Sequence, residues 1–308
     1  MQNFLRNKKI LILGGSGFVG KYIIDHLLQN GSRVIVLTRN SNKIKASKVS
    51  GDPGQLEIVS GNIFEDGLLE LLIQNKFAVI NLCGVLFEKQ KNEFDVIHHF
   101  LPDMISKLCK KNKVNKFVHI SALGVSKSSS SSYSRTKALG DLKVTKNFKN
   151  STILRPSIIY GAGDNFFGLF SKISKFIPFI PIIGPNTKFQ PIYVDDVARA
   201  VIKVLNNINK TNKIYNLCGP KIYSFYELIQ MLLSNLDRKR VLIKVNPKLM
   251  MLPSLIIQNF PNPPFTYDQM KLLQNDNISD GLFDEINELN IEPSLLDTKL
   301  KELSKFYI

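Results

Sequence analysis

Short apolar runs alternate with longer amphipathic segments through the first half of the chain. Strands are predicted where these runs are rich in β-branched residues, at positions 10–13, 33–37, 56–59, 78–82, 117–120 and 152–154. Between most of these runs, apolar residues recur at helical spacing, and the first such segment ends at an Asn30-Gly31 stop signal. Strands that alternate with helices build βαβ units, so the pattern predicts an α/β, doubly wound fold on a parallel sheet.

The pattern changes after Pro156. Residues 166–184 are apolar and aromatic but broken by prolines, which predicts a lid or second-domain element, whereas residues 192–205 and 214–217 resume the strand-and-helix pattern. Ser224 and Glu227 form a predicted capping box, and five prolines between positions 247 and 264 indicate a small irregular domain. We therefore assign residues 1–165 with 187–218 to the main domain. Residues 166–186 with 219–308 are assigned to a smaller C-terminal domain for substrate or docking.

Composition and length narrow the class of protein. The chain has 308 residues, 44% of them hydrophobic, and no apolar run of the length that spans a bilayer, so no transmembrane segment is expected. Residues 1–9 lack an apolar signal core, which predicts a cytoplasmic protein, or one that is peripheral at the inner face of the membrane. Cys83, Cys109 and Cys218 lie far apart, so neither a disulfide framework nor a metal site is expected.

The formal net charge of +16 raises the question of nucleic-acid binding. The lysines are scattered rather than clustered, however, and residues 276–302 are rich in Asp and Glu. This distribution argues against a nucleic-acid partner and leaves an acidic protein or an anionic membrane surface open.

The first predicted strand runs directly into a glycine-rich turn. Glycines recur at three-residue spacing, at positions 14, 17 and 20, where the first predicted helix begins. In a Rossmann fold, the first glycine permits the tight turn, the second lets the backbone approach a pyrophosphate, and the third lets helix and strand pack closely. The helix N-terminus then offers free N–H groups to the phosphates. We therefore predict a dinucleotide site at Gly14, Gly15, Ser16, Gly17, Phe18, Val19 and Gly20.

The end of the second predicted strand indicates which dinucleotide is bound. A carboxylate there usually accepts a hydrogen bond from the ribose 2′-hydroxyl of NAD, but this chain reads Thr38-Arg39-Asn40. Arg39 can pair with a 2′-phosphate instead, so NADP(H) is the preferred cofactor and NAD(H) remains an alternative. A solvated surface arginine is the other interpretation of Arg39.

Tyr133 and Lys137 stand four residues apart on a predicted helix, so both side chains project from one face. A neighbouring ammonium can stabilise a tyrosinate, so such a tyrosine can exchange a proton with a substrate while the lysine also holds the nicotinamide ribose. The same spacing is common on solvated helices, but its position after the fifth strand of a glycine-turn domain favours an active site. Tyr133, Lys137 and the nearby Ser121 are the candidate catalytic residues.

These motifs together resemble those of extended or atypical short-chain dehydrogenases/reductases, the NAD-dependent epimerase/dehydratase superfamily. The resemblance includes the glycine turn, Tyr133-x-x-x-Lys137, the Leu154–Gly161 segment and Tyr193–Ala198, and it covers nearly the whole chain. It implies further cofactor contacts at Asn62, Cys83, Gly84 and Pro156, in addition to those of Arg39, Tyr133 and Lys137. More narrowly, residues 119–124, 163–167 and 190–193 resemble the nucleotide-binding accessory subunits of respiratory complex I and their bacterial relatives.

One departure from the superfamily pattern bears on mechanism. Active members carry a Ser or Thr just after the fifth strand that hydrogen-bonds the substrate oxygen, and here Ala122 takes that position. Ser121 is adjacent and on a strand would face the opposite side, so it is no automatic substitute. Two hypotheses follow: a weakly or non-catalytic NADP(H)-binding subunit of complex I, or an active NADP-dependent reductase, epimerase or dehydratase that uses Tyr133 and Lys137. The apolar stretches 166–184 and 249–265 suit either a docking surface or ordinary small-domain core.

Overall fold

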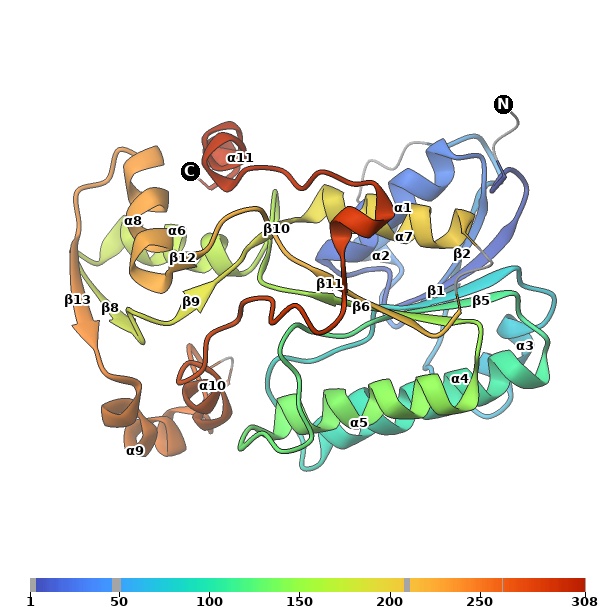
Figure 1. The fold of residues 1–308 in the computed structure, drawn as a ribbon, viewed down its shortest axis with the longest axis horizontal. Coiled ribbons are helices and arrows are strands. Elements are labelled where there is room, and N and C mark those ends of the chain that lie inside the picture. Colours follow the sequence, from blue (N-terminus) through green and yellow to red (C-terminus); the bar gives the residue numbers. More distant parts are fainter. Residues whose placement is uncertain (1–3, 46–50, 208–210, 262, 308) are drawn as a thin grey trace.

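The computed structural model describes residues 4–45, 51–207, 211–261 and 263–307 (Figure 1). Its centre is a sheet of eight parallel strands in the order β14-β11-β6-β5-β4-β1-β2-β3. The strands are β1 (Lys9–Leu13), β2 (Arg33–Thr38), β3 (Leu56–Ser60), β4 (Ala78–Asn81), β5 (Lys116–Ile120), β6 (Ser151–Pro156), β11 (Lys213–Leu217) and β14 (Asp284–Glu285). The predicted α/β, doubly wound parallel fold is confirmed, and all six strands predicted in the first half are present within two residues of their expected bounds.

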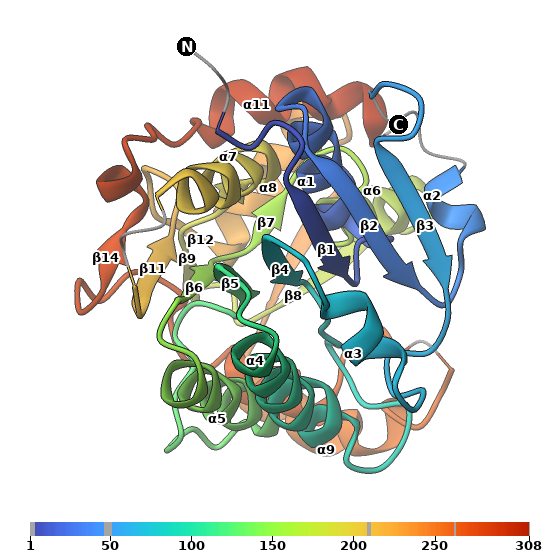
Figure 2. The same ribbon diagram turned by 90° about the vertical axis from the view of Figure 1, so that its right-hand side faces the viewer.

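Helices cover both faces of this sheet, as Figure 2 shows. One face carries α1 (Phe18–Gln29) and α7 (Val194–Asn206), and the other carries α3 (Leu68–Ile73), α4 (Leu101–Lys111) and α5 (Ser132–Asn147). Along β1, Ile10 and Ile12 pack in the core under α1 and α7, while Leu11 and Leu13 pack in the core under α4. Because successive side chains of a strand point to opposite faces, burial of both faces explains why the sheet strands read as continuous apolar runs.

The chain reverses its direction of progress across the sheet at β1. This strand pairs with β2 on one side, and on the other side with β4, which leads on to β5 and β6. In doubly wound folds, the crevice beyond the carboxyl ends of the strands at such a switch point is where ligands bind. The glycine turn follows β1 at this position.

A smaller domain lies at one end of the molecule (Figure 1). It contains α6 (Phe166–Phe176), β8 (Phe179–Ile183), α8 (Phe225–Asn235), β13 (Val241–Val245), α9 (Pro247–Ile257), α10 (Tyr267–Leu272) and α11 (Leu296–Leu303). Its core includes Phe167, Phe225 and Leu228, and β8 pairs parallel with β13. The predicted capping box of Ser224 and Glu227 is present at the start of α8.

Short elements complete the chain. They are α2 (Asn42–Lys45), the π-helix η1 (Asp95–Phe100), β7 (Ile159–Tyr160), β9 (Lys188–Phe189), β10 (Ile192–Tyr193), β12 (Tyr223–Ser224), η2 (Ile286–Leu289) and η3 (Ser304–Phe306). Within the described ranges, no helix is long and apolar enough to cross a membrane.

The structure differs from the predicted division of the chain at one segment. Residues 219–308 were assigned to the smaller domain, but β14 pairs parallel with β11 and becomes the edge strand of the central sheet. Ile286, Leu289 and Ile291 then pack into the main-domain core. The physical reason is that β14 has only two residues and is followed by only three spaced apolar side chains, which is too weak a local pattern to predict a strand. Its partner β11 also lies more than 60 residues earlier in the chain.

Candidate cofactor-binding site

Two glycines of the turn after β1 are required by packing within the chain itself. Gly14 has φ +78, and a Cβ there would lie 3.0 Å from the backbone of Leu82 and Cys83. A Cβ at Gly20 would lie 2.3 Å from the carbonyl oxygen of Gly15. These contacts bring the turn against the end of β4 and bring α1 against the turn, as the Rossmann roles of the first and third glycines require.

Gly17 differs because a Cβ there would make only an ordinary van der Waals contact. It has extended backbone with φ −78, and the nearest atom to an added Cβ is Gly14 O at 3.5 Å. Gly17 is also the N-cap of α1, and no side chain of the described residues caps this helix end. The free N–H groups of the first turn are an anion site by geometry and dipole, so this cradle fits the pyrophosphate of a dinucleotide.

The remaining turn residues connect the cradle to its surroundings. Ser16 Oγ accepts a hydrogen bond of 3.1 Å from Thr38 Oγ1 at the end of β2. Phe18 and Val19, in the first turn of α1, line a cavity described below. The turn therefore contacts β2 on one side and opens toward the cavity on the other.

Arg39 and Asn62 lie at the outer part of the same sheet edge. Arg39 is exposed and directly follows Thr38, whose hydroxyl is bonded to the glycine turn. Asn62 is exposed after β3, two strands from β1, and its Oδ1 accepts a 3.1 Å hydrogen bond from Phe64 N in its own loop. Arg39 is thus placed next to the turn, whereas Asn62 has no such connection to it.

Lys137 lies against the cofactor crevice from the opposite side. Its side chain is 4% exposed, and Nζ donates a 3.2 Å hydrogen bond to Ile120 O at the end of β5. A Cβ at Gly84 would lie 3.5 Å from Nζ, so the lysine touches the segment that follows Cys83. Burial lowers the pKa of Lys137 to about 8, although the Asp141 carboxylate partly opposes that shift.

Tyr133 lies one helical turn before Lys137 on α5, and two aromatic side chains pack against its ring. Its ring packs edge-on against His98 at 5.1 Å and against Phe94 at 5.8 Å. Burial, with a smaller contribution from Asp141, raises the pKa of Tyr133 to about 12. The phenol therefore keeps its proton at neutral pH and acts as a hydrogen-bond donor.

The residues expected to assist Tyr133 lie at the end of β5. Ser121 and Ala122 both line the cavity, so the strand alternation expected at this point does not remove Ser121 from it. Ser121 Oγ is buried and lacks a hydrogen-bond partner of normal geometry within the described residues. Ala122 offers no hydroxyl.

A buried polar network under Lys137 was missed by sequence reasoning. Asp141 is paired with Arg155, whose Nε and Nη2 each lie 2.9 Å from Oδ2, and His119 Nε2 lies 3.6 Å from Oδ1. His119 Nδ1 contacts Asn81 Nδ2 at 3.1 Å, and Asn81 Oδ1 accepts from Cys83 N. Burial raises the pKa of Asp141 against the opposing effect of Arg155, and burial lowers that of His119. A polar residue inside each of β4, β5 and β6 was the available sequence signal.

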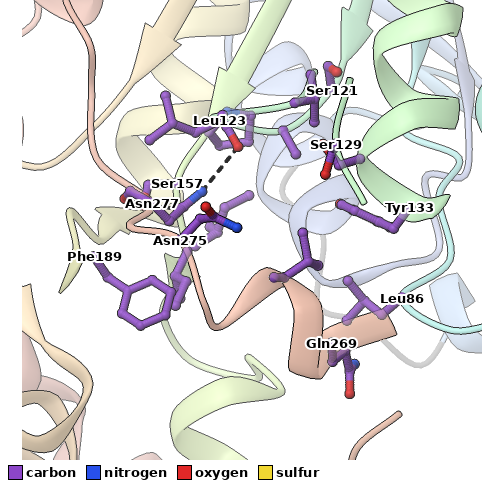
Figure 3. Close-up of a pocket in the computed structure, with 18 of the residues that line it drawn as sticks. Leu86, Ser121, Leu123, Ser129, Tyr133, Ser157, Phe189, Gln269, Asn275 and Asn277 are labelled. Atoms are coloured by element: carbon purple, nitrogen blue, oxygen red, sulfur yellow. Dashed lines mark hydrogen bonds between the residues drawn. The ribbon is translucent and has the colours of Figure 1, made fainter. Parts of the chain in front are cut away.

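The C-terminal segment also reaches the site. Asp268 of α10 accepts hydrogen bonds from Ser131 Oγ, Ser132 N and Tyr133 N at 2.6, 2.7 and 3.1 Å, so it caps the helix that carries Tyr133. Asn277 accepts from Ser157 Oγ at 2.7 Å and donates to Leu123 O at 3.0 Å (Figure 3). No local pattern signals these partners, which lie more than 100 residues away in sequence.

These segments enclose a cavity of about 810 Å³. Its lining includes the predicted site residues Phe18, Val19, Ser121, Tyr133 and Pro156. Figure 3 shows Ser121 and Gln269 at opposite ends of this lining. A polar cradle for phosphates, a buried lysine and a cavity beside a tyrosine together define a dinucleotide-binding Rossmann protein.

Comparison with known proteins agrees with this description. Residues 10–218 match the model of the NAD dependent epimerase/dehydratase family, and the chain belongs to that family. It is 29% identical over 300 residues to the mitochondrial NADH dehydrogenase [ubiquinone] 1 alpha subcomplex subunit 9 of Dictyostelium discoideum, covering 96% of this chain and 84% of that protein. The subunit of the same name from Mus musculus is 27% identical, with 95% and 78% covered.

Solved structures show the same fold. A dTDP-glucose 4,6-dehydratase from Bacillus anthracis in complex with NAD superposes with a TM-score of 0.70 at 20% identity, covering 97% of this chain and 96% of that one. The expected resemblance to the epimerase/dehydratase superfamily is confirmed, and so is the narrower similarity to complex I subunits.

Proposed function

We propose that this chain is an NADP(H)-binding, weakly or non-catalytic accessory subunit of respiratory complex I, the NADH:ubiquinone oxidoreductase. The observation that carries the loss of catalysis is Ala122, which lines the cavity beside Tyr133 without a hydroxyl. A missing donor to a developing oxyanion costs on the order of a hundredfold or more in rate. Relatives named as complex I subunits over almost the whole chain support the accessory role.

The cofactor in this proposal is NADP(H). Arg39 is exposed beside the glycine turn, and residues 36–40 hold no carboxylate that would repel a 2′-phosphate. An arginine forms a charge-assisted, often bidentate pair with phosphate, which NADH cannot offer at that position. NAD(H) would bind through the same turn with fewer contacts.

An exposed apolar surface on the smaller domain supports docking to a large assembly. On α9, Leu249, Leu252 and Ile256 share one helix face and are 72%, 76% and 69% exposed. Strand β13 leads into α9, and Val241 at its start and the paired Phe179 of β8 are also 56% and 57% exposed. Exposed apolar side chains of this kind mark interaction sites in soluble proteins, and we call Leu249, Leu252 and Ile256 the α9 surface.

The chain segments that carry the α9 surface and the neighbouring α6 and β8 are positively charged. Residues 166–183 contain two lysines and residues 238–260 contain five lysines or arginines, and neither segment contains Asp or Glu. Such charge favours an acidic subunit or anionic lipid head groups around the interface. We place the protein on the inner face of the membrane, held there by the complex.

In this proposal, the bound cofactor stabilises the fold even though no substrate is turned over. A ligand that binds only the folded state stabilises the fold by about 2.7 kcal/mol at a hundredfold excess over Kd. The proposed cofactor contacts lie on β1, β2, β4 and α5 of the main domain. Loss of the cofactor would destabilise that domain, to which the smaller domain with the α9 surface is joined by the hydrogen bonds of Asp268 at the start of α5.

The test is native-gel fractionation of membranes followed by mass spectrometry, with wild type and Gly17→Val compared. Gly17 has a backbone that valine can adopt, and a Cβ there makes only an ordinary van der Waals contact, so the substitution blocks the phosphate cradle without a clash inside the chain. We expect wild type to migrate with complex I, and Gly17→Val to lose NADPH and yield less intact complex. A wild-type protein found only in the soluble fraction, with normal complex assembly in its absence, contradicts the proposal.

The second candidate is an active NADP-dependent reductase, epimerase or dehydratase on a small carbonyl or nucleotide-sugar substrate. Tyr133 and Lys137 beside a cavity of about 810 Å³ favour it. Robust NADPH-dependent turnover that disappears in Tyr133→Phe would establish this activity. Under the accessory-subunit proposal, turnover is slow or absent, and Ala122→Ser is the change most able to raise it.

A further inference from the structure

The cavity beside Tyr133 is lined by no lysine or arginine of the described residues, although the chain is rich in both and has 41 of them in its sequence. The one charged residue of the lining is Asp276, whose carboxylate accepts a 2.8 Å hydrogen bond from Lys188 N. A nucleoside diphosphate carries two or more negative charges, and sites for such groups supply arginine, lysine or a helix N-terminus. The N-terminus of α1, which lines this cavity, is assigned to the cofactor phosphates. At the N-terminus of α6, which also lines it, Phe167 N and Gly168 N already donate to Asp164.

Most polar side chains of the lining are already engaged. Asn277 uses its amide on Leu123 O and its carbonyl on Ser157, and Gln269 Oε1 accepts from Thr266 N at 3.0 Å. At the rim, Lys271 Nζ donates to Ser130 O at 3.2 Å and lies over the Tyr267 ring. These groups therefore bond to the protein itself and form part of the cavity wall.

Two hydroxyl groups lie at the cofactor end of the cavity, those of Tyr133 and Ser121. Tyr133 lines the cavity, and the buried Ser121 Oγ has no hydrogen bond of normal geometry within the part of the chain described, although Ser121 is near enough to Asp141 to lower the pKa of that carboxyl. Leaving a buried hydrogen-bonding group without a partner is costly, so a ligand acceptor at this end would be favourable.

The wall also has a large apolar part, alongside the serines of residues 126–134 and the amides of Asn165 and Asn275. The apolar part includes Ile120, Leu123, Ile159, Phe166, Phe189 and Leu272, contributed by both the main domain and the smaller domain. Ligand cavities of this size are lined mainly by hydrophobic side chains, with a few polar groups that orient the ligand.

We propose that this cavity binds an uncharged molecule with an extended apolar chain and a carbonyl oxygen that accepts a hydrogen bond from Tyr133. The inference rests on the proposed function in one respect, namely that the bound NADPH closes the cofactor end. The proposed ligand is therefore lipid-like and is not a nucleotide sugar. With Ala122 in place, the ligand is held and not turned over.

The test is calorimetric titration of the full, NADPH-loaded chain with a 2-alkanone series from 2-butanone to 2-decanone, and with UDP-glucose. We expect affinity to rise about fourfold per added methylene, the ~0.8 kcal/mol of one buried CH2 converted at 1.4 kcal/mol per tenfold. UDP-glucose should show no saturable binding. Ketone affinity that is independent of chain length, or UDP-glucose binding tighter than 2-decanone, overturns the proposal.

Two variants locate the binding. Tyr133→Phe should weaken 2-decanone binding about fivefold by loss of one hydrogen bond, whereas Tyr226→Phe on α8, outside the cavity, should leave it unchanged. Leu272→Arg should abolish ketone binding, and the 77% exposed Leu282→Arg is its matched control. If Tyr133→Phe and Leu272→Arg bind 2-decanone as wild type does, the ligand lies elsewhere and the proposal fails.

Failure of this inference is distinguishable from failure of the proposed function. NADPH affinity is measured on the same samples by the fluorescence of the bound cofactor. Ketone binding without NADPH binding contradicts the accessory-subunit proposal and supports the cavity assignment. NADPH binding and complex I association without ketone binding overturn the cavity assignment alone.

Discussion

Arg39 is the residue on which the cofactor preference depends. We expect Arg39→Ala to lower NADPH affinity about tenfold, since a hydrogen bond to a charged group contributes about 1.5 to 3 kcal/mol and exposure places this one at the low end. NADH affinity should not change. Arg33→Ala is the matched control, because Arg33 is exposed at the start of β2, the strand that Arg39 follows. Calorimetry with both cofactors measures this, and equal wild-type affinities for them would contradict the assignment of Arg39.

The buried ammonium of Lys137 predicts a specific pH dependence of stability. Its pKa is about 8 in the folded protein and 10.5 when unperturbed, so above about pH 8 the unfolded chain binds more protons and the free energy of unfolding rises with pH. Relative to Lys137→Met, wild type should gain roughly 2 kcal/mol between about pH 7.5 and pH 9.5.

Urea unfolding at several pH values, without cofactor, checks the Lys137 prediction. Lys143→Met is the control because Lys143 lies on the same helix but is 44% exposed. A wild-type stability that keeps a constant difference from Lys137→Met across this pH range would show that the ammonium is not desolvated.

At the scale of elements, the connection between α10 and α5 is the contact that joins the smaller domain to the site. Asp268 accepts three hydrogen bonds at the first turn of α5, and helix caps contribute about 0.5 to 2 kcal/mol each. Asp268→Ala should therefore lower the free energy of unfolding by about 1 to 2 kcal/mol and speed amide exchange at Ser132 and Tyr133.

Chemical denaturation and hydrogen exchange measure the effect of Asp268→Ala. Asp280→Ala is the comparison, because Asp280 is exposed and bonds to Leu282 N in its own loop. Unchanged exchange at the start of α5 would mean that Ser131 alone caps this helix, since its Oγ also accepts from Ser134 N.

At the scale of the whole molecule, the α9 surface should carry the association with complex I. Leu249 and Leu252 are 72% and 76% exposed, so replacing both with serine removes apolar contact area without opening a core cavity. We expect the Leu249→Ser, Leu252→Ser double variant to keep wild-type stability and NADPH affinity but to lose most of its co-migration with the complex in native gels.

A matched double variant controls the α9 experiment. Leu71 on α3 and Leu282 near β14 are 64% and 77% exposed outside the α9 surface, and Leu71→Ser with Leu282→Ser should leave co-migration unchanged. Equal loss of association in both double variants would show that general surface hydrophobicity, and not this face, carries the contact.

The sequence by itself determined the layered α/β core and the cofactor end of the site. Apolar runs, helical spacing and glycine spacing are local signals, and each corresponds to a local requirement: burial on both sheet faces, one packed helix face, and the close approaches at Gly14 and Gly20. Tyr133 and Lys137 were predicted to lie on one helix face for the same reason, because two residues four apart on a helix share a face whatever the rest of the fold does.

Only the tertiary structure decided which distant residues complete the site. The Asp268 cap, the Asn277 bridge and the return of β14 to the sheet each join segments separated by more than 60 residues. Such contacts depend on chain packing in three dimensions and leave no periodicity in the sequence. The same reason explains why a chain with 41 lysines and arginines has a cavity that none of those in the described ranges lines, since the lining is selected by the fold from residues spread between Phe18 and Asn277.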